Sequence, residues 1–275
     1  MELGFIGLGD LGAPMADRLW KAGWPLHIWA RRQSTLDQFR GTPVKIEDSP
    51  AAVGGACDFV GLCVTDDSDV RSVVLEQNLL SSMRPGSVLA IHSTVTPGLI
   101  KQIEDFATEL GVLLADAPIS GTHEDAADGN LNVLLGAAPE VHKLGLPVWQ
   151  AFAKNIFLVG PTGTGQVFKV LNNTLLCANR RVAMDAIELA DRLGLDGGEV
   201  ARCLVVTSAR SYALESLVTK YTPAIAEHAA PLLKKDVGIL RSVCDSHELY
   251  DARVVDLAEK FIPMLSDGSW EIASA

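Results

Sequence analysis

The hydrophobic pattern of the chain changes once, near residue 160. Before that point, short apolar runs of strand length alternate with segments in which apolar residues recur at helical spacing. Alternating strands and helices are typical of a doubly wound, largely parallel sheet, and we expect the last two strands to extend its far edge. The predicted strands are Leu3–Ile6, Leu26–Trp29, Phe59–Val64, Ser87–His92, Val112–Asp116, Leu131–Leu135 and Ile156–Val159.

After the glycine-rich segment Gly160–Gly165, the spacing stays helical and no convincing strand follows. Residues Gln166–Leu193 predict an unusually long helix, which ends before Gly194 as helices commonly do. We therefore expect an α/β fold: a doubly wound sheet in residues 1–161 and an all-helical domain in residues 162–275, joined by the long interdomain helix. The other predicted helices are approximately Asp196–Leu204, Ser211–Thr219, Pro231–Ser246 and Tyr250–Leu265.

A length of 275 residues is sufficient for two domains that each bury a core. The sequence has no run of 18 apolar residues and no leader-like segment, which predicts a soluble, unprocessed protein. The formal net charge of −11 would repel nucleic acid or an anionic membrane surface. The five cysteines form no C-x-x-C pair, which favours a reducing cytoplasm over disulfides or a structural zinc site.

The most informative local motif is Gly7-Leu8-Gly9-Asp10-Leu11-Gly12, which joins the first predicted strand to a helix-like stretch from Ala13 to Lys21. In a Rossmann-type turn, Gly7 allows the tight bend, Gly9 lets the backbone approach a pyrophosphate, and Gly12 lets the helix pack on the strand. The free N–H groups and the positive end of the helix favour the anion. Because strand, turn and helix follow in this order, the motif predicts dinucleotide binding in a Rossmann domain.

The end of the second predicted strand, Ala30-Arg31-Arg32, indicates which dinucleotide binds. Enzymes that use NAD usually place Asp or Glu here to bind the ribose 2′-hydroxyl, which Ala30 cannot do. The planar guanidinium groups of Arg31 and Arg32 suit a 2′-phosphate. We therefore predict NADP in preference to NAD, although adjacent arginines in a loop can also be an ordinary solvated surface.

Two segments carry residues that could act on a substrate. Lys169, Asn172 and Asn173 share one face of the long helix, and an amine among apolar neighbours can serve as an acid or base near neutral pH. Taken alone, Lys169 is better explained as a solvated helix lysine. The segment Asp116–Thr122 follows a predicted strand, at the sheet edge where ligands bind, and its Ser120-Gly121 turn could hold a carboxylate.

The acidic segment after this turn does not predict a metal site. It contains His123, Glu124, Asp125 and Asp128, but no second histidine at ligand spacing.

The order of these segments resembles the beta-hydroxyacid dehydrogenase family, which includes 3-hydroxyisobutyrate dehydrogenase and is related to 6-phosphogluconate dehydrogenase. GFIGLGDLGAPMA resembles the family's cofactor loop, and HSTVTP resembles the segment near the nicotinamide. DAPISGT resembles the substrate loop, GTGQVFKVLNN the catalytic helix, and KKDVG the Lys-Asp motif of the second domain. The resemblance covers nearly the whole chain.

The resemblance implies hydride transfer between a nicotinamide and a small beta-hydroxyacid or semialdehyde, in a homodimer or homotetramer. Lys169 would be the general acid or base, with Asn173 as the second catalytic residue. The implied substrate-binding residues are Ser120, Gly121, Thr122 and Asn172. The implied cofactor-binding residues are Gly7, Leu8, Gly9, Asp10, Leu11, Gly12, Ala30, Arg31, Arg32, Val64, Thr65, Thr94 and Lys235.

Two alternatives and one departure limit this interpretation. An imine reductase shares the architecture but usually lacks a catalytic lysine, so Lys169 argues against it. A non-catalytic NADP-binding scaffold would have no reason to keep Lys169, Asn173 and Ser120 together. The family usually has glycine where this chain has Thr122, and the added side chain could narrow the substrate loop or add a hydrogen bond.

Overall fold

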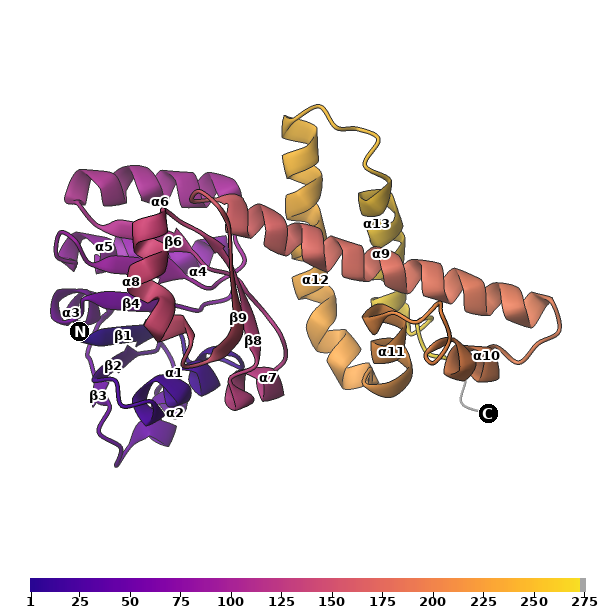
Figure 1. Cartoon of the computed structure of the whole chain (residues 1–275), viewed down its shortest axis with the longest axis horizontal. Helices are drawn as coiled ribbons and strands as arrows, with labels where there is room; N and C mark the ends of the chain where they lie inside the picture. Colours follow the sequence, from indigo (N-terminus) through magenta and orange to yellow (C-terminus); the bar gives the residue numbers. More distant parts are fainter. Residues whose placement is uncertain (273–275) are drawn as a thin grey trace. The chain divides into compact units, whose positions relative to one another are not determined.

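The computed structural model describes residues 1–272, and its chain divides into two compact units, Met1–Lys169 and a second that begins at Val170. The first unit holds a mostly parallel sheet flanked by helices (Figure 1). Its described strands are β1 (Leu3–Ile6), β2 (Leu26–Trp29), β3 (Lys45–Ile46), β4 (Phe59–Leu62), β5 (Val88–Ile91), β6 (Leu113–Asp116), β7 (Ile119–Ser120), β8 (Leu131–Gly136) and β9 (Ala153–Gly160).

The strand order is β3-β2-β1-β4-β5-β6-β8-β7, with β9 paired to β8. The strands from β3 to β6 are parallel, β8 runs antiparallel to β6, and β9 runs parallel to β8. The helices of this unit are α1 (Gly12–Lys21), α2 (Gln33–Leu36), α3 (Pro50–Ala56), α4 (Asp67–Arg71), α5 (Leu79–Ser82), α6 (Pro97–Leu110), α7 (His123–Asp128) and α8 (Pro139–Trp149).

The sheet is buried on both faces, because neighbouring residues of one strand enter different cores. In β1, Phe5 packs in one apolar cluster with α1 and α8, whereas Ile6 packs in another with α3 and α6. The same alternation holds for Phe59 and Val60 in β4. Strands covered on both faces read as continuous apolar runs, which is why the sequence pattern identifies them.

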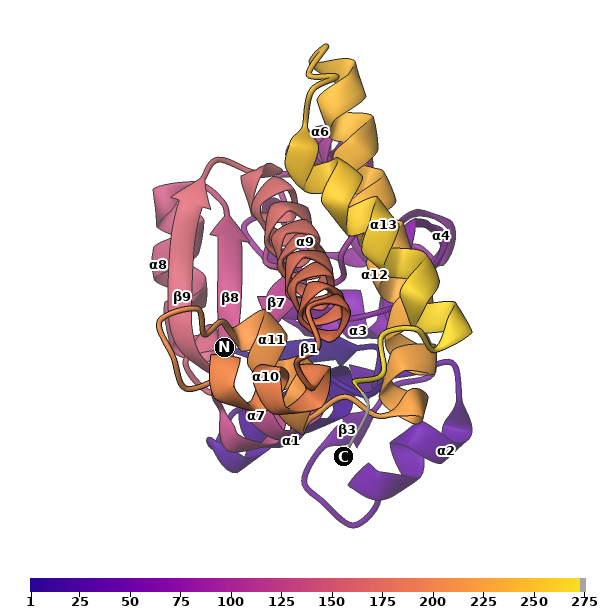
Figure 2. The same cartoon turned by 90° about the vertical axis from the view of Figure 1, so that its right-hand side faces the viewer.

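The second unit contains only helices within its described residues. A single helix, α9 (Thr164–Arg192), belongs to the first unit at its start and to the second for the rest of its length. Its partners in the second unit are α10 (Gly197–Leu204), α11 (Tyr212–Thr219), α12 (Pro223–Ser246) and α13 (Arg253–Asp267). Helices α12 and α13 lie side by side (Figures 1 and 2), and Phe261 at 0% exposure lies in their shared core.

The predicted fold class is confirmed, and the last two predicted strands do extend the far edge of the sheet. Strands β3 and β7 were not predicted, because two residues are too few to show a period. The domain division predicted at residues 161 and 162 stays a prediction, because α9 runs without a break through both units.

The predicted helix start at Pro231 is wrong. Helix α12 begins eight residues earlier at Pro223, where the Thr222 hydroxyl caps it by accepting a hydrogen bond from the Ile225 N–H at 3.3 Å. From the sequence, either Pro223 or Pro231 could be the first residue of this helix, because proline is favoured at that position. Pro231 instead lies inside α12 on an exposed position, where water can hydrate the backbone carbonyl that it leaves without a donor.

The carboxylate of Asp116 joins the end of β6 to the start of α9. The residue is 0% exposed and accepts hydrogen bonds from the N–H groups of Gly163 at 2.6 Å and Gln166 at 2.8 Å. Glycine is required at position 165, because a Cβ there would lie 2.8 Å from the carboxylate. Burial raises the pKa of Asp116 to about 7, although the surrounding backbone hydrogen bonds act to lower it.

A second connection joins α9 to the loop after β5. The Gln166 side chain is 0% exposed, and its Oε1 accepts a hydrogen bond from the Val95 N–H at 3.0 Å. Its Nε2 donates to the Ser93 carbonyl at 3.0 Å. Both polar ends of this buried amide are therefore satisfied, and the first turn of α9 is fixed to the carboxyl ends of two parallel strands.

We expect Asp116→Asn to lower the free energy of unfolding by about 1–3 kcal/mol, because an amide nitrogen would face a backbone N–H that has no other acceptor. The difference should depend on pH. Since the pKa rises from 3.8 to about 7 on folding, the carboxyl contributes fully to stability below about pH 4. That contribution is lost as pH rises towards 7, so the advantage of the wild type over Asp116→Asn should shrink over this range.

Urea unfolding of both proteins between pH 4.5 and 7.5 measures this difference. Asp105→Asn is the matched control, because its carboxylate is 64% exposed on α6 and should change stability by less than about 0.5 kcal/mol. An advantage that stays constant or grows with pH contradicts the raised pKa.

Candidate active site

The turn between β1 and α1 has the geometry that each glycine was predicted to allow. Gly7 has φ +91°, a left-handed value, and a Cβ there would overlap the Cys63 carbonyl and lie 2.9 Å from Val64 Cγ1. A Cβ at Gly12 would overlap the carbonyl of Gly7. At Gly9, by contrast, a Cβ would meet nothing within 4 Å. The turn is therefore closely packed on the protein side and open at Gly9.

The open side of this turn presents unused backbone donors. Within residues 1–272, no acceptor receives a hydrogen bond from the N–H groups of Gly9, Asp10 or Leu11. No side chain caps α1, whose N-cap residue is Leu11. Helix N-termini with free N–H groups bind phosphates and other anions. The turn thus fits the pyrophosphate of a dinucleotide.

The residues after β2 have different environments. Ala30 is 8% exposed and offers no polar side chain. Arg31 is 79% exposed in its side chain, and its Nη1 lies 3.2 Å from Asp69 Oδ1 at the start of α4. Arg32 is exposed, and its extended backbone immediately precedes α2. The partner Asp69 was missed from the sequence, because it lies in the helix that follows β4, a strand separated from β2 by β1.

The loops after β4 and β5 contain the other predicted cofactor residues, and one hydrogen bond joins these loops. The Val64 N–H donates to the Ser93 hydroxyl at 2.8 Å. Thr65 follows on the exposed surface, and Thr94 is partly buried one residue after Ser93. These positions lie at the same carboxyl edge of the sheet as the β1 turn, since β1, β4 and β5 are parallel neighbours.

The predicted substrate loop leaves β7 and enters α7. Ser120 pairs with Asn132 of β8, and its carbonyl accepts a hydrogen bond from Asn132 Nδ2 at 3.3 Å. Gly121 has φ +149°, and a Cβ there would lie 2.6 Å from Leu131 Cδ2. Only glycine fits this close approach without strain.

Thr122, the departure from the family pattern, is the N-cap of α7. Its hydroxyl accepts a hydrogen bond from the Asp125 N–H at 3.2 Å, and its own N–H donates to Asp125 Oδ2 at 2.7 Å. This reciprocal capping box satisfies two backbone donors of a short helix. The threonine side chain therefore has a structural role at the end of the predicted substrate loop.

The predicted catalytic residues lie on α9. Lys169 is partly buried in the first unit, and Asn173 lies one helical turn later, in the second unit. Asn172 Nδ2 donates to Asn173 Oδ1 at 3.0 Å, and Asn173 Nδ2 donates to Asp236 Oδ2 at 2.7 Å. These two bonds determine which end of the Asn173 amide is the donor.

The Lys-Asp motif of α12 takes part in the same network within the second unit. Asp236 is 4% exposed, and Lys235 Nζ lies 3.5 Å from its Oδ1. The structure therefore brings Asn172, Asn173 and Lys235 together around Asp236. Asp236 was not among the predicted site residues, although a carboxylate at an otherwise apolar helix position is a signal that could have found it.

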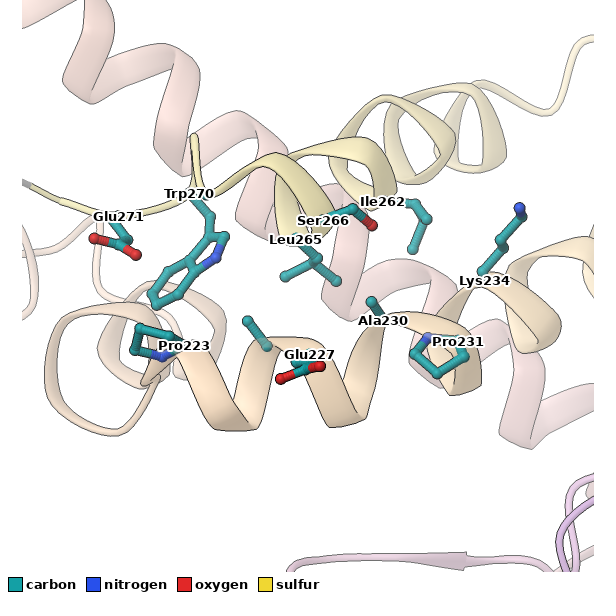
Figure 3. Close-up of a pocket in the computed structure, with 12 residues that line it drawn as sticks. Pro223, Glu227, Ala230, Pro231, Lys234, Ile262, Leu265, Ser266, Trp270 and Glu271 are labelled. Atoms are coloured by element: carbon teal, nitrogen blue, oxygen red, sulfur yellow. The ribbon is translucent and has the colours of Figure 1, made fainter.

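A separate pocket of about 570 Å³ lies between α12 and α13 in the second unit (Figure 3). Trp270 and Pro223 lie at one end of it, and Lys234 lies at the other. None of the predicted site residues lines this pocket, so it gives no reason to move the candidate active site.

Within residues 1–272, no three or more His, Cys, Asp or Glu side chains are grouped to hold a metal ion. The same residues include no helix both long and apolar enough to span a bilayer.

Comparison with known proteins connects these features to a family. The family model described as the NAD binding domain of 6-phosphogluconate dehydrogenase matches residues 2–160. The model described as NAD-binding of NADP-dependent 3-hydroxyisobutyrate dehydrogenase matches residues 163–268. The two models together span nearly the whole chain.

Individual relatives agree with this assignment. The NAD-dependent L-serine dehydrogenase of Pseudomonas aeruginosa is 31% identical over 255 residues, which cover 89% of this chain and 86% of that protein. The mitochondrial 3-hydroxyisobutyrate dehydrogenase of Pongo abelii is 28% identical over 254 residues, covering 89% and 76%.

A solved structure shares the fold along nearly the full length. The 3-hydroxyisobutyrate dehydrogenase of Mycobacterium tuberculosis, determined with L-serine, matches with a TM-score of 0.84 and 22% identity over 99% of this chain and 96% of that one. From the matched family models and the L-serine dehydrogenase relative, the chain belongs to the beta-hydroxyacid dehydrogenase family of NAD(P)-dependent oxidoreductases.

Proposed function

We propose that the protein is an NADP-dependent oxidoreductase that interconverts a small beta-hydroxyacid and its semialdehyde, with Lys169 as general acid or base. One observation carries the proposal: Asp116 and Gln166 fix the first turn of α9 to the carboxyl ends of β6 and β5. The same edge of the sheet carries the open N–H groups of the β1 turn. Lys169 follows Gln166 by three residues, so its position relative to this edge is held by buried hydrogen bonds.

The residues of this chain have distinct roles in the proposed reaction. The nicotinamide, when bound, supplies the hydride chemistry. The amine of Lys169 takes the proton from the substrate hydroxyl during oxidation and returns it during reduction. Asn173 and Asn172 orient the substrate, and Asp236 holds Asn173 in one amide orientation. Lys235 is the proposed cofactor contact from α12.

The proposed substrate class follows from the loop before α7. The Ser120 hydroxyl and the unhindered backbone at Gly121 suit a carboxylate, which a beta-hydroxyacid carries. Names of relatives support a small substrate of this kind, since they include L-serine and 3-hydroxyisobutyrate dehydrogenases. Thr122 is proposed to shape this loop through the cap of α7.

The preference for NADP rests on this chain's own residues. Ala30 lacks the carboxylate that binds a ribose 2′-hydroxyl, and the exposed Arg31 guanidinium suits a 2′-phosphate. The names of similar proteins point both ways, because the Pseudomonas relative is named NAD-dependent and the second family model is described as NADP-dependent. Arg32 is proposed as a second phosphate contact.

We further propose that residues 1–161 bind the cofactor and residues 162–275 complete the substrate site in a homodimer or homotetramer. A cytoplasmic location is supported by the five cysteines, which lie within the described residues and are free thiols.

Replacing Lys169 tests the proposed acid–base role. We expect Lys169→Ala to lower kcat for oxidation by about 10²- to 10⁴-fold, because proton transfer from the hydroxyl loses its acceptor. NADPH affinity, measured by calorimetry, should change little. The matched control is Lys260→Ala, which removes an exposed lysine of α13 and should retain full turnover. Turnover near that of the wild type in Lys169→Ala would exclude the assigned role.

Replacing Arg31 tests the choice of cofactor. We expect Arg31→Ala to weaken NADP binding by roughly 10- to 150-fold, because a charge-assisted contact to phosphate contributes about 1.5–3 kcal/mol. NAD binding should change much less. Arg40→Ala is the control, since that side chain is 67% exposed and pairs with Asp37. Equal losses of NADP and NAD affinity would show that Arg31 does not contact the 2′-phosphate.

A further inference from the structure

A carboxylate lies in the middle of the turn that has the open backbone donors. The Asp10 side chain is 66% exposed, and the residues on either side of it are Gly9 and Leu11, whose N–H groups also lack acceptors within residues 1–272. A pyrophosphate bound here carries two negative charges, so an ionised Asp10 on the same turn opposes its binding. A nearby positive charge would offset that repulsion.

The imidazole of His123 contacts this residue from a distant part of the chain. His123 Nδ1 lies 2.8 Å from the Asp10 carbonyl oxygen and 3.3 Å from Asp10 Oδ1. Because a carbonyl can only accept a hydrogen bond, Nδ1 carries a proton and donates it. The ring is therefore neutral when Nε2 has no proton and positively charged when Nε2 has one. The side chain is 52% exposed, so solvent protons reach it.

His123 also belongs to the structure that holds the substrate loop. It is the first residue of α7 and follows the cap residue Thr122 directly. Helices α1 and α7 lie side by side within the first unit, as both views show (Figures 1 and 2). The contact between His123 and Asp10 thus joins the cofactor turn to the end of the Ser120-Gly121 loop.

The charged groups of α1 near this contact have their own partners. On α1, Asp17 pairs with Lys21, and Arg18 Nε donates to the Ala151 carbonyl at 2.9 Å. The remaining charged residues of α7 are Glu124, Asp125 and Asp128, of which Asp125 forms the capping box with Thr122. Within residues 1–272, Asp10 is the one carboxylate within ion-pair distance of His123.

We propose that His123 is a positioning residue whose protonation neutralises Asp10 and so strengthens pyrophosphate binding to the turn as pH falls. This inference rests on the proposed use of the turn for the cofactor. Because the contact is part of the turn itself, dinucleotide affinity should be higher when the imidazole is charged than when it is neutral. The proton is added at Nε2, and the Nδ1 hydrogen bond to the Asp10 carbonyl is retained in both charge states.

The test measures binding of ADP-ribose by calorimetry between pH 5.5 and 8.5. ADP-ribose carries the pyrophosphate but no 2′-phosphate, whose own titration would otherwise confuse the result. We expect the wild-type Kd to be about three- to fivefold lower at pH 6 than at pH 8, the size typical of an exposed ion pair. His123→Asn retains a donor near the Nδ1 position without a titratable charge, and Asp10→Asn removes the carboxylate.

His123→Asn should lose the pH dependence of Kd, because it has no group that gains charge. Asp10→Asn should bind ADP-ribose at pH 8 about as tightly as the wild type does at pH 6, because the repelling carboxylate is gone. His142→Asn on α8 is the matched control and should keep the wild-type pH dependence. His123→Ala, which also removes the hydrogen bond to Asp10, should raise KM for the hydroxyacid more than it lowers kcat, and His123→Asn should restore part of that KM.

Equal pH dependence in the wild type and in His123→Asn would overturn this inference and leave the proposed function standing. A wild-type Kd that is independent of pH would overturn it in the same way. Absence of ADP-ribose binding at every pH would overturn both this inference and the proposed cofactor site.

Discussion

The buried carboxylate of Asp116 and the buried amide of Gln166 fix the start of α9, and the proposed chemistry depends on that start. A helix whose first N–H groups are satisfied by a carboxylate from β6 cannot slide along the sheet without leaving buried polar groups unpaired. Lys169 is three residues beyond Gln166, so it lies one helical turn from the buried hydrogen bonds that hold the start of α9. The same constraint explains why glycine is needed at position 165, where any side chain would strike Asp116.

The turn after β1 and the loop after β7 are connected through contacts that are separate from the hydrogen bonds of Asp116 and Gln166. The turn after β1 is packed against Cys63 and Val64 on one side and open at Gly9 on the other. The loop after β7 ends in the capping box of Thr122 and Asp125, which orients α7 so that its first residue reaches Asp10. The Thr122 hydroxyl thereby stabilises the helix that carries His123.

Local features of the site could be predicted from the sequence, and long-range ones could not. The turn of Gly7, Gly9 and Gly12 is determined by neighbouring residues, so its order of strand, bend and helix is visible in the chain itself. The contact of Asp116 with Gln166 joins residues 50 positions apart, and that of Asp10 with His123 joins residues 113 positions apart. The spacing of apolar residues along the chain does not predict contacts between residues so far apart. Pro231 misled the prediction because a proline inside a helix and one at its first position look alike until the cap at Thr222 is known.

The most direct test of the proposed function is a steady-state assay of the wild-type protein with a panel of small beta-hydroxyacids, including L-serine and 3-hydroxyisobutyrate, followed by the absorbance of reduced coenzyme. The account predicts that at least one beta-hydroxyacid reduces the coenzyme, with a higher kcat/KM for NADP than for NAD. Turnover of imines alone, or no turnover of hydroxyacids, semialdehydes and imines with either coenzyme, would contradict it.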